Sequence, residues 1–63
     1  MRYFVRETFT NDDGKTVVEW WGPGHRSAAE ALAWFKWAFG PYDPAEVEAD
    51  LLPEKPEEVL VRS

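Results

Sequence analysis

Ten of the 63 residues are aromatic and none is cysteine, and this combination constrains the fold more than any other feature of the sequence. A chain this short buries roughly 60% of the surface that its unfolded form exposes, so it can build only one core. Without cysteine, neither a disulfide nor a thiolate metal site can add stability. Because each large ring buries on the order of 150–250 Å², we expect residues 1–63 to fold as a single domain around an aromatic core.

The first third of the chain predicts a β-hairpin. Residues 2–10 are rich in β-branched and aromatic side chains, which favour a strand. The segment Asn11-Asp12-Asp13-Gly14 follows, and it supplies the positive φ angles that a tight hairpin loop requires. A second strand is expected over residues 15–21. Gly22-Pro23-Gly24 should end it, because proline cannot donate to a strand ladder.

The middle of the chain predicts a long helix over residues 28–39. Ser27-Ala28-Ala29-Glu30 has the form of a capping box, in which the serine hydroxyl and the Glu30 carboxylate satisfy two N–H groups of the first turn. Gly40 and Pro41 follow in the order that ends helices.

The last third predicts a short second helix and a final strand. Asp43 has the form of an N-cap and Pro44 of a first helical residue, so a helix is expected to run to Leu51 or Leu52 and to end at Pro53. Residues 58–62 are strongly β-prone and predict the last strand.

These elements predict a small two-layer α+β domain with the order β-β-α-α-β. Three antiparallel strands in the spatial order 2-1-3 would be packed by the long helix on one face, with the C-terminal strand beside the first strand. The short acidic second helix would complete the domain.

Two tryptophans of the expected long helix lie away from its core stripe. We expect one stripe of the helix to face the sheet, made of Ala28, Leu32, Phe35 and Phe39, whereas Trp34 and Trp37 point about 140–160° from Leu32. Either the second helix or the connector after it folds back over this flank, or the indoles form a hot spot for a partner or for a second copy of the chain.

Other aromatic and basic residues have structural interpretations. Trp20 and Trp21 should place one indole on each face of the sheet. Arg2 and Arg6 share a face of the first strand and should pair with acidic side chains across the sheet. His25 is the single histidine, and we expect it to be an exposed loop residue.

Acidic side chains are concentrated in one segment. Residues 43–58 contain seven acids and one lysine, a local charge of −6, in a chain whose net charge is −5. This segment is either a solvated face or a surface that imitates phosphate spacing and docks on a basic groove. The residues expected to contact a partner are Trp34, Trp37, Glu46, Glu48, Asp50 and Glu54.

The residue types present argue against catalysis, cofactor binding, direct nucleic-acid binding and membrane binding. Neither a nucleophile with its base, nor a phosphate loop, nor a metal-ligand spacing is recognisable, so neither catalysis nor a cofactor is expected. A net charge of −5 opposes direct binding to nucleic acid or to anionic membranes. With neither a membrane span nor a signal peptide recognisable, we expect a cytoplasmic protein.

The sequence therefore predicts a non-catalytic protein-binding module, a small acidic inhibitor of a larger basic or nucleic-acid-handling protein. Compact acidic inhibitors encoded by phages and mobile elements, some of them nucleic-acid mimics, share this size and charge as a class. The alternative is a small self-associating domain, a homodimer through exposed aromatic residues.

Overall fold

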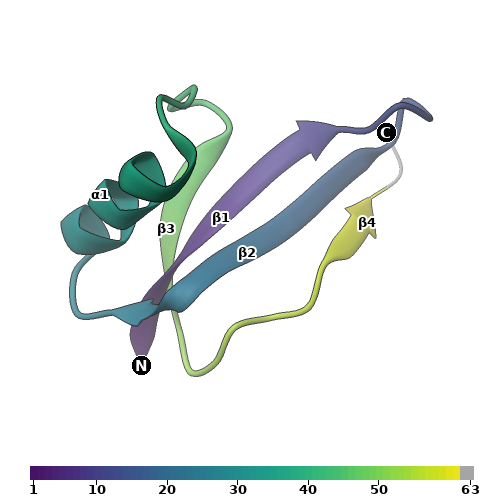
Figure 1. Ribbon diagram of the computed structural model, residues 1–63. Helices are drawn as coiled ribbons and strands as arrows, with labels where there is room; N and C mark the ends of the chain where they lie inside the picture. The colour runs from purple at the N-terminus through teal and green to yellow at the C-terminus, as the bar shows by residue number, and fades with distance from the viewer. Residues whose placement is uncertain (62–63) are drawn as a thin grey trace.

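The protein is an α+β domain in which one helix packs on an antiparallel sheet (Figure 1). The computed structural model describes the backbone of residues 1–61 and the side chains of residues 1–58. The elements in chain order are β1 (Arg2–Thr10), β2 (Thr16–His25), α1 (Ala28–Phe39), β3 (Val47–Leu52) and β4 (Val59–Val61). Within the described range the strands lie in the order β3-β1-β2-β4. The predicted fold class, with three antiparallel strands ordered β2-β1-β3 against one long helix, is confirmed.

The predicted hairpin connects β1 to β2, and the side chain of Asn11 holds its turn together. Its Oδ1 atom accepts hydrogen bonds from the backbone N–H groups of Asp13 and Lys15, both at 3.0 Å. The N–H of Gly14 donates to the Asn11 carbonyl at 3.0 Å, with a φ of 76° that glycine adopts without strain. The turn chemistry therefore matches the sequence pattern.

The second strand is longer than the sequence predicts. The expectation that Gly22-Pro23-Gly24 ends the strand is wrong, because β2 continues to His25. The register with β1 shifts at this segment, and the two glycines have φ angles of 102° and 93°. Extra residues opposite a partner strand form a β-bulge, which bends the strand without ending it. The glycines therefore absorb a bulge within β2.

The long helix has the predicted bounds and begins at the predicted Ser27 N-cap, but the Glu30 carboxylate accepts no hydrogen bond among the described residues. The Ser27 hydroxyl accepts a hydrogen bond from the N–H of Glu30 at 3.1 Å. At the other end the N–H of Gly40 donates to the carbonyl of Lys36 at 2.8 Å. These contacts satisfy backbone groups that a helix terminus leaves open.

The predicted second helix is wrong, since its residues form a turn and then strand β3. The Asp43 carboxylate accepts from the N–H of Ala45 at 2.9 Å, and the Asp43 carbonyl accepts from the N–H of Glu46 at 2.9 Å. This single turn ends where Val47 begins β3. Apolar and acidic residues alternate along residues 47–50, which is the period of a half-buried strand. Pairing with β1 uses that alternation and overrides the local helix-start signal.

The C-terminal strand lies at the opposite edge of the sheet from its expected position. Residues 59–61 pair with residues 16–18 of β2, and the place beside β1 belongs to β3. Residues 53–58 connect β3 to β4 and run beside β2 (Figure 1). Arg62, the last residue of the expected strand, lies outside the described residues.

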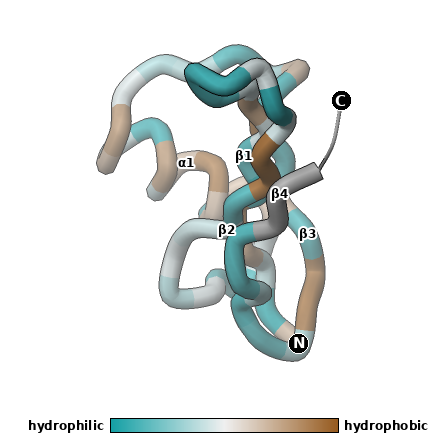
Figure 2. The backbone as a smooth tube through the Cα atoms, turned by 90° about the vertical axis from the view of Figure 1, so that its right-hand side faces the viewer, coloured by the Kyte–Doolittle hydropathy of each residue, from teal (hydrophilic) through white to brown (hydrophobic). Residues whose placement is uncertain are grey.

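The core lies between α1 and one face of the sheet. Val5 and Ala31 are completely buried, and Phe35 and Val47 are 3% and 5% exposed. Figure 2 shows the helix on one side of the sheet. Figure 1 shows that the tip of the β1–β2 hairpin extends beyond the part of the sheet that the helix covers. Among the described residues, the other sheet face therefore has no covering helix.

Candidate interaction surfaces

The acidic residues predicted to contact a partner lie on and around the edge strand β3. Glu48 and Asp50 belong to the strand, Glu46 precedes it and Glu54 follows it. Glu48 pairs in register with Arg6, the residue after buried Val5. Successive side chains of a strand point to opposite faces, so Glu48 and Asp50 lie on the sheet face opposite α1.

A basic residue and an indole bind the acids of β3. The Arg6 guanidinium forms an ion pair with the Glu48 carboxylate and lies 3.4 Å from Asp50 Oδ2. The indole Nε1 of Trp20 donates to the same Asp50 oxygen at 3.2 Å. The side chain of Asp50 is 23% exposed and that of Glu48 is 66% exposed. Asp50 therefore has a structural role, while most of Glu48 remains accessible.

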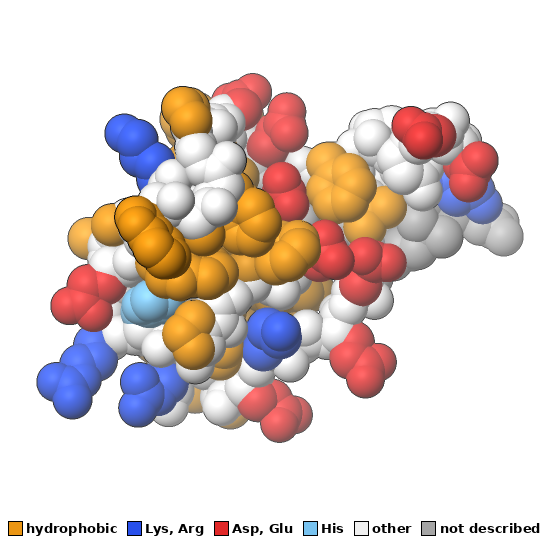
Figure 3. All heavy atoms as spheres, viewed as in Figure 1, with side chains coloured by type: hydrophobic (Ala, Val, Ile, Leu, Met, Phe, Trp, Pro, Cys, Tyr) orange, Lys and Arg blue, Asp and Glu red, His pale blue; other side chains and the backbone are white. Residues whose placement is uncertain are grey.

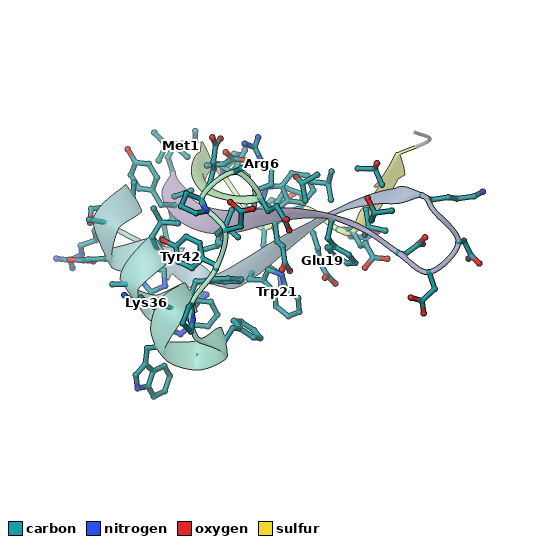
Figure 4. All side chains as sticks on the ribbon, turned by 90° about the horizontal axis from the view of Figure 1, so that it is seen from above. Met1, Arg6, Glu19, Trp21, Lys36 and Tyr42 are labelled. Atoms are coloured by element: carbon teal, nitrogen blue, oxygen red, sulfur yellow. The ribbon has the colours of Figure 1, made fainter. Side chains whose placement is uncertain are left out.

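These contacts confirm two expectations from the sequence. Arg6 pairs with acidic residues across the sheet, as predicted, whereas Arg2 lies opposite Leu52 and forms no ion pair within the described residues. Trp20 lies on the face of Asp50, and Trp21 packs against the core under the helix. In Figure 4 the labelled side chains of Arg6 and Trp21 point to opposite sides of the sheet.

The expectation that Trp34 faces away from the core is wrong. Its ring lies 5.8 Å from that of His25 and 6.1 Å from that of Phe39, measured between centroids. A Cβ placed on Gly22 would meet the Trp34 indole at 3.5 Å. The bulge places Gly22, and the continuation of β2 after it places His25, beneath this flank of the helix. The sequence did not predict this packing, because the second strand was expected to end at Trp21, before Gly22 and His25.

Trp37 is the accessible tryptophan of α1, since 83% of its surface is exposed. Phe39 is 54% exposed, although one part of its ring packs against Trp21 at a centroid distance of 5.0 Å. Figure 3 shows hydrophobic side chains gathered over α1. Exposed aromatic residues are enriched where protein interfaces concentrate their binding energy.

The predicted contact residues do not form one continuous surface. Trp37 projects from the helix, whereas Glu48 and Asp50 lie on the opposite face of the sheet. Trp34 is packed between the helix and β2. The acidic residues therefore form one candidate surface and the end of the helix another.

A shallow hollow beside the helix was not predicted. It has a volume of about 250 Å³ and is lined by Lys36, Pro41, Tyr42 and Pro44. The Tyr42 ring packs against Phe35 with a centroid distance of 5.6 Å. Figure 4 shows Lys36 and Tyr42 on the helix side of the sheet. The sequence Gly40-Pro41 predicts that the chain changes direction after the helix, but it does not predict a hollow there.

A second acidic cluster also escaped the sequence analysis. Glu7 and Glu19 pair across β1 and β2, and the Trp21 indole donates to Glu7 Oε1 at 3.1 Å. Burial raises the pKa of Glu19, and a hydrogen bond with Glu58 and the charges of Glu58 and Glu7 add to this rise. Counting the hairpin register outward from its turn would have placed Glu7 opposite Glu19.

The prediction of an exposed loop position for His25 is wrong. His25 ends β2 and is half-buried against Trp34. Its Nε2 atom is buried and makes no hydrogen bond within the described residues. Among residues 1–61, no group of three His, Cys, Asp or Glu side chains is arranged to hold a metal ion.

Two further observations bear on the protein's class. No helix in the described part of the chain is long and apolar enough to cross a membrane. Comparison with protein families, curated proteins and solved structures finds no match for this chain.

Proposed function

We propose that the protein is a non-catalytic protein-binding module that acts in the cytoplasm as a small acidic inhibitor. It recognises a larger protein through the acidic surface of Glu46, Glu48, Asp50 and Glu54. The partner presents a basic groove of the kind that holds nucleic acid, and the module occupies that groove as phage and mobile-element inhibitors do. The observation that carries this proposal is the exposure of Glu48 beside Asp50 on a sheet face without a helix, with exposed Glu46 and Glu54 before and after the strand.

The local electrostatics support this proposal. Arg6 is the basic residue that contacts Glu48 and Asp50, so the acids around β3 outnumber the base that neutralises them. Complementary charge accelerates association with a basic surface and opposes wrong partners. Because Glu46, Glu48 and Glu54 are exposed, salt should weaken the interaction.

The test is an affinity capture from a lysate of the source cells, using a tagged chain and two matched variants. E46K/E48K reverses exposed acids at β3, and D12K/D13K reverses exposed acids in the hairpin turn. Both variants change the net charge from −5 to −1. The proposal predicts a basic protein that is retained by D12K/D13K and lost by E46K/E48K or by high salt. If the two variants retain the captured protein equally, the acidic surface does not bind the partner and the proposal is wrong.

A second candidate function is self-association through the end of the helix. Trp37 favours it, because 83% exposure leaves a large apolar ring in water. Sedimentation equilibrium at high protein concentration tests this candidate, with Trp37→Ser as the variant. A concentration-dependent dimer that Trp37→Ser abolishes supports it, and a monomer at all concentrations contradicts it.

A further inference from the structure

The outer edge of β3 has backbone groups that bond to no other part of the described chain. β3 is the terminal strand of the sheet on the side away from β2 (Figure 1). The Thr8 N–H donates to the Glu46 carbonyl at 2.8 Å, which fixes the bonding pattern between β1 and β3. In antiparallel pairs, directly opposed residues alternate between bonded and non-bonded. Glu48 and Asp50 therefore bond to β1, and Val47, Ala49 and Leu51 direct their N–H and C=O groups outward.

The side chains of β3 determine which residue types an added strand would need. On the helix side, Ala49 is half-buried and Leu51 is 46% exposed. On the other side lie the carboxylates of Glu48 and Asp50. A strand added to the edge would place alternate side chains beside these two sets. Aliphatic residues match the first set, and lysine or arginine matches the second.

A second copy of the chain does not match this edge. If two β3 strands pair antiparallel with Ala49 opposite Ala49, Glu48 of one copy lies directly opposite Asp50 of the other. Like charges directly opposite each other destabilise a strand pair. Charges on edge strands are a known device against self-pairing, and the same charges favour a basic strand.

We propose that β3 receives an extended segment of a partner protein as an additional antiparallel strand, with lysine or arginine at alternate positions and aliphatic residues between them. This inference rests on the proposed function and names how the acidic surface would engage its partner. Backbone hydrogen bonds to Val47, Ala49 and Leu51 supply affinity, and the acids of β3 supply selectivity. Strand addition at an open sheet edge is an established mode of peptide recognition.

The test uses a capped hexapeptide of three valine-lysine repeats and two N-methylated forms of it. In antiparallel addition the valines oppose Val47, Ala49 and Leu51, so valine N–H groups bond to β3 and lysine N–H groups point away. Binding is measured by titration with two-dimensional NMR. Methylating the three valine nitrogens should weaken binding by about tenfold or more, and methylating the three lysine nitrogens should leave it within about twofold. Equal binding of the two methylated peptides overturns the proposal.

A protein variant provides an independent measurement. Ala49→Pro removes an outward N–H without removing a bond to β1, a position that proline tolerates in edge strands. We expect Ala49→Pro to keep the native NMR spectrum outside β3 and to bind the parent peptide about tenfold more weakly. Unchanged binding by folded Ala49→Pro contradicts the proposal. If this variant does not fold, the two methylated peptides still decide the question.

The outcomes separate this inference from the proposed function. If Glu48→Lys abolishes peptide binding while both methylated peptides bind equally, the acidic surface stands and strand addition is wrong. If no peptide binds while lysate capture depends on Glu46 and Glu48, strand addition is again wrong and the proposed function stands. If the peptides behave as predicted but capture does not depend on these acids, the edge binds strands and the proposed inhibitor function is wrong.

Discussion

The indole of Trp20 on β2 donates a hydrogen bond to the carboxylate of Asp50 on β3, across the central strand β1. Arg6 of β1 lies between them, with its guanidinium 3.4 Å from the same carboxylate oxygen. Three strands are therefore linked by side chains on the face opposite the helix. This linkage separates the roles of two neighbouring acids, because Asp50 is fixed in the network and Glu48 is largely exposed.

Removing the charge of Asp50 should destabilise the fold more than removing that of Glu48. Asp50→Asn weakens a charge-assisted hydrogen bond and an ion pair, with an expected loss of about 1–2 kcal/mol in the free energy of unfolding. Glu48→Gln removes an exposed ion pair and should cost no more than about 0.5 kcal/mol. Urea denaturation of the two variants measures both values, and equal losses would show that the Trp20 bond adds no stability.

Alanine at Gly24 should cost more than alanine at Gly40. The two glycines have positive φ angles, 93° and 92°, at which a side chain strains the backbone. A Cβ at Gly24 would lie 2.8 Å from Cδ of Arg2, whereas nothing lies within 4 Å of a Cβ at Gly40. We expect Gly24→Ala to lower the unfolding free energy by about 1 kcal/mol more than Gly40→Ala. Equal melting temperatures for the two variants would contradict the close approach of β2 to the first residues of β1.

The two tryptophans of α1 should differ in their contribution to stability. Trp34→Ala removes a packed indole and should cost about 2 kcal/mol. Trp37→Ala exchanges an exposed ring for a residue with high helix propensity, so it should change stability by less than about 0.5 kcal/mol. Thermal unfolding followed by circular dichroism compares them. A large loss in Trp37→Ala would mean that its ring is covered in solution.

The stability of the protein should depend on pH through Glu19. Burial and the nearby acids Glu58 and Glu7 raise the pKa of Glu19, so the folded chain binds its proton more tightly than the unfolded chain does. This contribution is fully present below the ordinary pKa of a glutamate and is lost as the pH rises through the raised value. At neutral pH, Glu19→Gln should therefore be slightly more stable than the native chain, by about 0.5 kcal/mol or less.

The measurement for Glu19 is a pair of unfolding curves at each pH between 3 and 8. The advantage of Glu19→Gln should vanish towards the acidic end of this range. Asp12→Asn, at an exposed position in the hairpin turn, is the control for removing one negative charge. An equal gain in the control would assign the effect to net charge instead of to the cluster around Glu19.

Features set by local chemistry were predicted from the sequence. The Asn11 turn and the Ser27 and Gly40 caps depend on contacts within a few residues, and the structure confirms each of them. The pairing of Arg6 with acids also followed from alternation along β1. Local signals of this kind need no knowledge of which strands become neighbours.

The features that were missed depend on pairing between distant segments. Asp43 and Pro44 form a strong helix-start signal, yet the alternation after Val47 fits an edge position beside β1. The free energy of that pairing outweighs a local preference of a few tenths to one kcal/mol, roughly the range of helix propensities. Trp34 packs against the bulge in β2, but in the sequence the Gly22-Pro23-Gly24 segment that forms this bulge has the pattern of a strand end. Both errors changed the candidate site, because they moved the acids onto a strand and one tryptophan into the fold.

The most direct test of the account is amide hydrogen exchange of residues 47–52, measured in the free protein. An edge strand paired on one side predicts alternation, with slow exchange at Glu48 and Asp50 and fast exchange at Ala49 and Leu51. Binding of a basic partner strand should then slow exchange at Ala49 and Leu51. Uniform protection through Leu51 in the free protein, as in a helix or a fully paired strand, would contradict both the open edge and the function proposed for it.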